Sequence, residues 1–133
     1  MIHNVITAVS HRLNIYIKNR LMINDDAVVV KNLVDLKGNV NDGIQNKIVV
    51  FLLSIEEDKT SKNKSVTKIT GNPAIMLNVN IMFAAFFSND AYVESLRYLS
   101  LIMEFFQKNP MFHFSDTPGL HSSNSNYMLK FTI

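Results

Sequence analysis

The stretch IVVFLLSI, residues 48–55, decides the fold of this chain, because seven of its eight positions are apolar. Its β-branched and aromatic residues favour an extended strand. A strand with one solvated face alternates apolar and polar residues, whereas a strand covered on both faces does not. The stretch therefore predicts a central strand with a covering layer on each side.

Three further segments have the composition of strands. A β-branched run covers 28–36, and a glycine-containing loop at 38–43 separates it from the central strand. After the central strand, apolar residues alternate along 75–87, and a last alternating segment covers 127–133. The chain is thus expected to contain four strands or more.

Two segments have the period of an α-helix. Apolar residues recur every three or four positions from about residue 2 to residue 21, and the polar cluster 24–26 ends that helix. A second helix is expected over about 91–108. Asp90 is its expected N-cap, and Glu94 falls in its first turn, where a carboxylate suits the positive end of the helix dipole.

In chain order these elements predict an α+β domain with the order α-β-β-β-α-β. We expect a mostly antiparallel sheet of four or more strands, with two helices on one face. Residues 1–133 are expected to form a single domain, because a chain of this length has room for one core. The Lys-, Ser- and Asn-rich stretch 56–72 is expected to be a flexible loop, and 111–126 to be irregular.

The second predicted helix has more apolar surface than one core requires. Its charged residues form only a narrow stripe, and a helix that is apolar nearly all round is buried on more than one side. One interpretation is that a second subunit covers the extra face. The other is that the first helix and the segment 109–126 cover it. Under the first interpretation the subunit-interface residues are Tyr92, Leu96, Leu99, Met103 and Phe106.

The composition excludes several kinds of protein. The absence of cysteine excludes a disulfide scaffold and a thiolate metal site. A net charge of +2 is too small for the electrostatic footprint of non-specific nucleic-acid binding. No segment approaches the roughly 20 apolar residues that a bilayer span requires. Polar residues also interrupt the first stretch, unlike the apolar core of a signal peptide. We therefore expect no nucleic-acid partner and no membrane insertion.

The sequence contains no pattern typical of a catalytic or metal site. His3 and His11, like His113 and His121, are eight residues apart, which does not fit the i, i+4 spacing of a helical metal site. The adjacent acids 56–58 lie beside the Lys-rich stretch, which favours solvent rather than the contrasting environments of catalytic carboxylates. There is no phosphate-binding glycine loop and no nucleophile elbow. We expect a protein that is not an enzyme and that binds no cofactor and no metal.

Several blocks of the sequence, in this order and spacing, resemble a known family. The N-terminal blocks are Leu13-Asn14-Ile15-Tyr16-Ile17, Asn32-Leu33-Val34-Asp35 with Gly38, Lys47-Ile48-Val49 through Ile55-Glu56-Glu57, and Pro73 before Leu77-Asn78-Val79. The C-terminal blocks are Tyr92, Glu94, Leu96, Leu99-Ser100, Ile102 and Phe105-Phe106-Gln107, then Phe112, Thr117-Pro118, Leu120 and Leu129. Over its whole length the chain resembles the N-terminal domain of tail-terminator (cap) proteins of phage-tail-like contractile injection systems, of the antifeeding-prophage and Photorhabdus virulence cassette type.

The resemblance implies a structural role. Members of this family form a ring, a hexamer, on the tail end away from the baseplate, where they stop growth of the tube and sheath. The implied partners are further copies of the chain and the sheath and inner-tube proteins of the same particle. The implied location is the cytoplasm during assembly and the injection particle afterwards.

Two segments are hypothetical contacts with sheath or tube. The Lys-rich loop would meet the rim of the tube or sheath, although its composition is more typical of a solvated loop without a partner. The strand 127–133 would offer an edge to a sheath arm. The residues of these hypotheses are Lys59, Lys62, Lys64, Tyr127, Leu129 and Phe131. The alternative function is an adaptor domain of a phage-like or secretion apparatus, which would dock a cargo or effector through the same loop.

The chain departs from the family pattern at two places. Asp116 stands where the family usually has Asn before Thr-Pro. Family members usually continue past the last strand into a segment with a Trp and a further strand, whereas this sequence ends at Ile133 and has no Trp. Compared with the usual family member, this chain is therefore expected to be shortened at its C-terminus.

Overall fold

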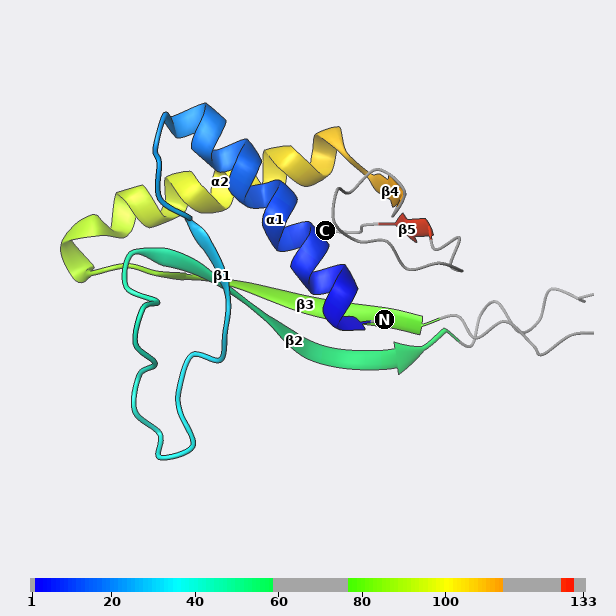
Figure 1. Ribbon diagram of the computed structural model, residues 1–133, viewed down its shortest axis with the longest axis horizontal. Coiled ribbons are helices and arrows are strands. Elements are labelled where there is room, and N and C mark those ends of the chain that lie inside the picture. Colours follow the sequence, from blue (N-terminus) through cyan, green and yellow to red (C-terminus); the bar gives the residue numbers. More distant parts are fainter. Residues whose placement is uncertain (1, 59–76, 114–127, 131–133) are drawn as a thin grey trace, which may run out of the picture.

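The computed structural model describes residues 2–58, 77–113 and 128–130 (Figure 1). The elements in chain order are α1 (Ile2–Leu21), β1 (Val28–Val30), β2 (Lys47–Glu57), β3 (Leu77–Phe86), a 3-10 turn η2 (Asn89–Ala91), α2 (Tyr92–Lys108), β4 (Met111–His113) and β5 (Met128–Lys130). The α+β class and both helices are as predicted, and α1 has the bounds that the apolar period indicated.

The sheet differs from the one predicted. Over the described residues it has three strands in the order β1-β2-β3, with β1 parallel to β2 and β2 antiparallel to β3. The described part of the expected fourth strand, β5, does not join it but pairs with β4, which was not predicted, in a separate two-stranded antiparallel sheet. Alternation indicates that a segment is extended and has two faces, but it does not indicate which strand is its neighbour. The predicted element order was therefore incomplete, and the predicted four-stranded, mostly antiparallel sheet is replaced by a mixed one.

The first strand is shorter than the predicted run 28–36. β1 ends at Val30, and the chain then leaves the sheet and turns at Asp35, whose Oδ1 accepts hydrogen bonds from the backbone N–H groups of Lys37 (2.8 Å) and Asn39 (2.9 Å). Gly38 completes the turn at a φ of +83°, a conformation that glycine adopts without the penalty of a side chain. Turn formation at Asp35 thus overrides the strand propensity of its apolar neighbours.

β2 is the central strand, as predicted, but it is covered on both faces only over its first half. Ile48, Val49 and Val50 are fully buried, and this is also the part that pairs with β1. Leu53 and Ile55 are exposed. The register with β3 shifts between Leu52 and Ser54, so Leu53 has no opposite residue in β3.

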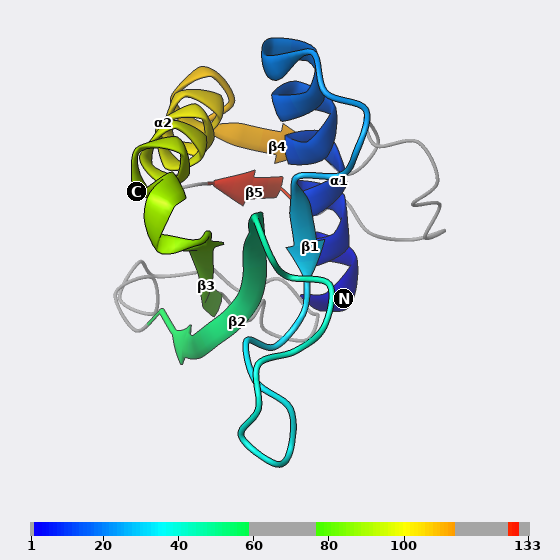
Figure 2. The ribbon, with the colours of Figure 1, turned by 90° about the vertical axis from the view of Figure 1, so that its left-hand side faces the viewer.

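The main core lies between the sheet and the two helices, which cover the same face of the sheet (Figures 1 and 2). The buried residues of this core come from α1, β1 and the residue before it, β2 and α2. They are Ile6, Val9, Leu13, Ile17, Ala27, Val28, Ile48, Val50, Ile102, Phe105 and Phe106. On the opposite face, Val49 is fully buried, and so is Ile44 in the segment that precedes β2. The segment between β1 and β2 therefore lies where the second layer, which covers the face of β2 opposite the helices, was expected.

Asn14 joins α1 to the sheet through its side chain. Its Oδ1 accepts hydrogen bonds from the backbone N–H groups of Ala27 (2.9 Å) and Val28 (2.8 Å), and its Nδ2 donates to the Val28 carbonyl (2.8 Å). Ala27 and Val28 are buried, so these backbone groups need protein partners. The Asn14 amide therefore fixes the entry of the chain into β1.

The second helix begins differently from the prediction. Asp90 is not its N-cap but lies inside η2, and Ala91 occupies the N-cap position without a side-chain hydrogen bond. The turn is closed by the backbone instead, because the N–H of Ala91 donates to the Ser88 carbonyl at 2.9 Å. A cluster of polar residues before a helix indicates where the helix begins but not which residue caps it.

Candidate interaction surface

An apolar stripe runs along the outside of α2. Tyr92, Leu96, Leu99 and Met103 follow one another at spacings of four, three and four, which places them on one side of the helix. The exposed fractions are 66% for Tyr92, 44% for Leu96 and 50% for Met103, and Leu99 is half-buried against the core. These four residues are called the α2 stripe below. The structure thus leaves open most of the face that the sequence analysis assigned to a subunit interface.

Phe106, the fifth residue of that predicted interface, belongs to the core. It is 7% exposed, and its ring centroid lies 5.5 Å from that of Phe83 and 5.3 Å from that of Phe105. A helix turns by about 100° per residue, so Phe106 lies about 60° round the helix from Met103, towards buried Ile102. The stripe is therefore the solvent-side margin of the core face, and Phe106 lies on the core side of that margin.

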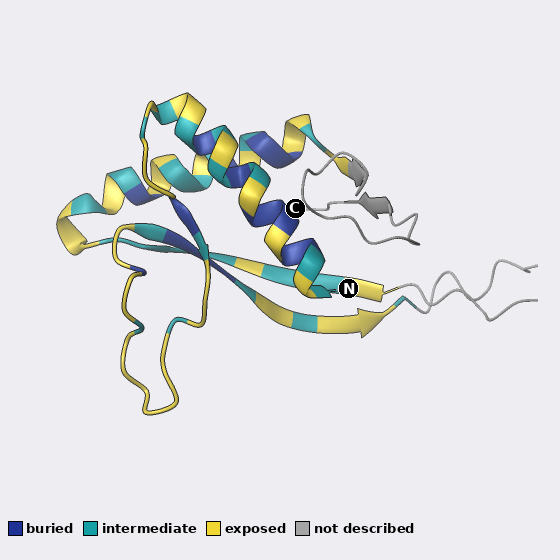
Figure 3. Cartoon of the chain, in the orientation of Figure 1, coloured by how far each residue is buried: buried dark blue, intermediate teal, exposed yellow. Residues whose placement is uncertain are grey.

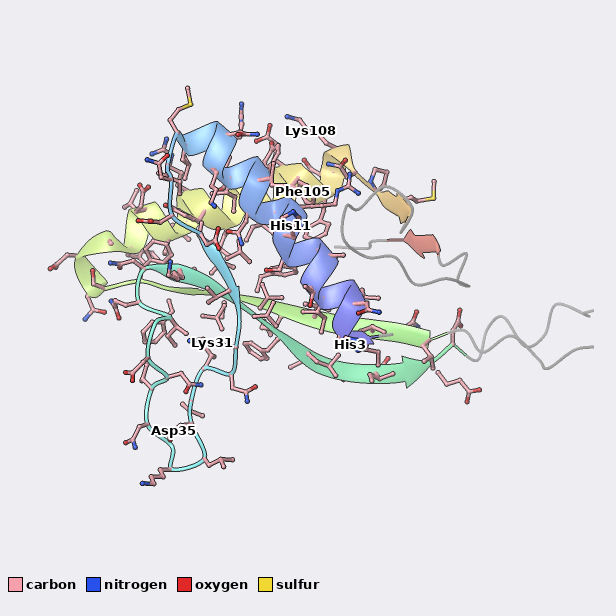
Figure 4. The ribbon with its side chains drawn as sticks, viewed as in Figure 1. His3, His11, Lys31, Asp35, Phe105 and Lys108 are labelled. Atoms are coloured by element: carbon pink, nitrogen blue, oxygen red, sulfur yellow. The ribbon has the colours of Figure 1, made fainter. Side chains whose placement is uncertain are left out.

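The rest of α2 is held firmly against the body. Phe105 packs on Tyr16 of α1 with ring centroids 5.4 Å apart, and Tyr98 packs on Phe87 at 5.0 Å. Burial raises the pKa of the Tyr98 hydroxyl. Figure 4 shows Phe105 between the two helices. The stripe is therefore carried on a helix whose other side is packed against the core.

An ion-pair cluster closes the end of α2. Glu104 accepts from Lys108 at 2.5 Å and from Arg20 of α1 at 3.1 Å. The hydrogen bond from Lys108, with a smaller contribution from Arg20, lowers the pKa of the Glu104 carboxyl, and the same bond raises the pKa of Lys108. Arg20 belongs to α1, so these charges lie toward α1 and away from the α2 stripe.

Two further surfaces expose apolar side chains, and neither was expected from the sequence to bind a partner. The ribbon tip is the end of the β2–β3 pair, residues 52–57 and 77–81, where Leu52, Ile55 and Leu77 are exposed. The arm is the segment 31–42 between β1 and β2, where Val34, Leu36 and Val40 are exposed (Figure 3). The apolar residues of the ribbon tip, and Val34 and Leu36 of the arm, were expected in strands, whereas Val40 was expected in the loop 38–43. Strand propensity does not indicate whether a neighbouring layer covers a residue.

The other predicted contact residues are not tested by the structure. Lys59, Lys62, Lys64, Tyr127 and Phe131 lie outside the described residues. Leu129 lies in β5, of which only the backbone is described. The hypotheses about the Lys-rich loop and the terminal edge therefore remain predictions.

The structure also places the histidines and acidic residues that could have formed a metal or catalytic site. His3 and His11 lie on α1, two turns apart (Figure 4), and Glu56 and Glu57 at the end of β2 are exposed. Within 2–58, 77–113 and 128–130, no three His, Asp or Glu side chains gather into a possible metal site. In the same part of the chain, neither helix is both long enough and apolar enough to cross a membrane.

Fold and surface together define a small α+β domain with two helices on one face of a mixed sheet and an apolar helix stripe facing outward. The chain belongs to the Pvc16 N-terminal domain family, whose sequence model matches residues 4–133. This family associates the protein with the phage-tail-like particles of the Photorhabdus virulence cassette type, as the resemblance of its sequence blocks implied. No curated protein is significantly similar to the chain.

Proposed function

We propose that this protein is a structural cap. It forms a ring on the baseplate-distal end of a contractile injection system tail and stops polymerisation of the tube and sheath. The observation that carries the proposal is the α2 stripe, because Tyr92, Leu96 and Met103 present apolar side chains to solvent on a helix whose other side is packed into the core. Membership of the Pvc16 N-terminal domain family supports the setting in a phage-tail-like particle.

The physical argument concerns self-association. Contiguous apolar surface on a small soluble domain is typical of an interface between proteins. A ring repeats one heterologous interface around its axis, so each copy needs two different contact surfaces, and the α2 stripe contributes apolar area to one of them. The role is non-catalytic and needs no cofactor. The partners are further copies of the chain, in a hexamer, and the sheath and inner-tube proteins, first in the cytoplasm and then in the particle.

The first experiment tests the stripe. Leu96→Glu places a charge in its middle, and we expect the ring-sized species seen by multi-angle light scattering, alone or with sheath protein, to be lost. The matched control is Arg97→Glu, which changes the helix charge by more but lies about 100° round the helix, and it should leave the species intact. A protein that stays monomeric with and without sheath and tube would contradict the proposal.

The second experiment tests capping. Particles assembled without this protein, examined by electron microscopy, should show tails of irregular length and an open distal end. Particles assembled with it should show uniform tails and one ring at that end. The adaptor alternative predicts normal tail length in both preparations and binding of a soluble cargo. Its docking loop, 56–72, lies almost wholly outside the described residues, so no described contact favours it.

A further inference from the structure

The arm is held in shape by its own hydrogen bonds. Near its tip, Val34 and Val40 form an antiparallel bridge, and the N–H of Asp35 donates to the Asn39 carbonyl at 2.8 Å. Further down, the N–H of Asn41 donates to the Leu33 carbonyl at 3.0 Å. The arm is therefore a small hairpin-like structure with a defined shape.

The base of the arm is tied in the same way. Nζ of Lys31 donates to the Asp42 carbonyl at 3.0 Å, and Nδ2 of Asn41 donates to the Asn32 carbonyl at 2.7 Å. Figure 4 shows Lys31 at the base and Asp35 toward the tip of this projection. A projection that is ordered before binding loses little conformational entropy when it docks.

The arm presents apolar side chains instead of burying them. Leu36 at its tip is fully exposed, and Val34 and Val40 are about half exposed. Lys37, also exposed, follows Leu36 directly. An ordered projection with an apolar tip and an adjacent cation has the chemistry of an anchor that enters an apolar surface with an acidic border.

The ribbon tip offers such a surface on one face. The register with β3 places Ile55 opposite Val79 and Glu57 opposite Leu77, so Ile55 and Leu77 share a face with Glu57 beside them. Ile55 and Leu77 are exposed. The other face is polar at the paired positions Ser54, Glu56, Asn78 and Asn80, and the exposed Leu53 lies in the bulge beside them.

The polar face of the ribbon tip has its own contacts. Nδ2 of Asn80 donates to Oγ of Ser54 at 2.8 Å, and Glu56 pairs with Asn78 in the register. The ribbon tip is therefore amphipathic. Its apolar face, which points to the same side of the sheet as the helices, is the candidate receptor.

The two surfaces lie at opposite ends of the molecule. The arm and the first turn of α2 lie toward the same end, which Figure 2 views, whereas the ribbon tip points the other way along the long axis (Figure 1). An arm cannot reach the ribbon tip of its own chain. It can reach that of another copy in a head-to-tail arrangement, which is the heterologous kind of contact from which rings are built.

We propose that the arm of one copy docks on the apolar face of the ribbon tip of the next. Leu36 packs against Ile55 and Leu77, and Lys37 faces Glu57. The apolar match and the opposite charges select a second copy as the occupant. This inference rests on the proposed ring, for which it supplies a specific pair of contacting surfaces.

A charge swap tests the pairing. Lys37→Glu and Glu57→Lys should each weaken self-association about tenfold, because each places like charges together. The double variant should return to within about threefold of the unmodified chain. Double-variant self-association no better than that of the single variants would overturn the proposal.

Cross-linking tests the contact itself, and the chain has no native cysteine to interfere. A short bismaleimide added to a mixture of the Leu36→Cys and Ile55→Cys variants should give a linked dimer in higher yield than with either variant alone. The matched control, Asn78→Cys, lies at the same ribbon tip but on the polar face. Linkage of Leu36→Cys to itself, or equal linkage to Asn78→Cys, would overturn the proposal.

The outcomes separate this inference from the proposed function. If rings form and tails are capped but the arm and ribbon tip do not cross-link, the arm inference is wrong and the cap proposal stands. If the chain does not self-associate and does not cap tails, both are wrong. If the cross-link forms but tails are not capped, the contact is correct and the function needs revision.

Discussion

Replacing Asn14 by alanine tests how the helix layer is joined to the sheet. The substitution removes three hydrogen bonds of 2.8–2.9 Å and leaves the backbone N–H groups of Ala27 and Val28 without their partner. Both residues are buried, at 3% and 2% exposure, so water replaces the lost partner poorly. An unsatisfied buried donor costs about 1–3 kcal/mol.

The expected magnitude follows from these terms. Two unsatisfied donors, offset by roughly 0.6 kcal/mol because alanine is the better helix former, give a loss of about 1.5–5.5 kcal/mol in the free energy of unfolding. This is a large share of the roughly 5–15 kcal/mol typical of a domain and corresponds to a fall in melting temperature on the order of 10 °C.

The assay is urea unfolding followed by circular dichroism, with Asn19→Ala as the matched control. Asn19 lies on the same helix and is exposed, so its replacement carries the same gain in helix propensity without the lost hydrogen bonds. We expect the control to stay within about 0.5 kcal/mol of the unmodified chain. If Asn14→Ala were no less stable than Asn19→Ala, the amide would not carry the connection to β1.

Three further predictions follow from the geometry. Phe106→Ala should cost about 3–5 kcal/mol in denaturant unfolding because it empties a core position, whereas Met103→Ala on the exposed stripe should cost under about 1 kcal/mol; equal losses would place both residues on the same face. Gly38→Ala should cost roughly 1–2 kcal/mol from backbone strain alone, since its φ is +83° and a Cβ there would touch nothing within 4 Å; no change in stability would show that the turn has another conformation. Hydrogen bonds from the backbone N–H of Asn39, and then from that of Lys37, hold the pKa of the Asp35 carboxyl below its usual value. The ionised carboxylate therefore stabilises the turn at a pH above the pKa of Asp35 in the unfolded chain, about 4, and this stabilisation is lost as the pH falls through the lower pKa of the folded chain. Hydrogen exchange of the Lys37 and Asn39 amides, corrected for the intrinsic exchange rate at each pH, should therefore become faster in acid. A corrected exchange rate that does not change with pH would contradict this.

The elements that depend on local pattern were predictable. The apolar period of three and four defines α1, and the alternation in 77–86 defines β3, because a helix or strand face repeats with its own backbone geometry. The position of β2 at the centre of the sheet also followed from its continuous apolar run. The α2 stripe was largely recognisable, since its residues exceed the apolar face that one core can cover.

The arrangement of these elements required the tertiary structure. Asp35 and Gly38 end a run that would otherwise continue as strand. The terminal strand β5 was expected to join the main sheet, but it pairs with β4. Phe106 and Met103 are both apolar and only three residues apart, yet one packs on Phe83 and the other faces solvent.

The sequence by itself determined which segments are helix or strand and which family the chain resembles, because backbone periodicity and motif spacing are local properties. Only the tertiary structure decided which apolar faces remain uncovered, among them the α2 stripe, the arm and the ribbon tip. Burial depends on which elements meet across the core, and a residue's own chemistry does not contain that information.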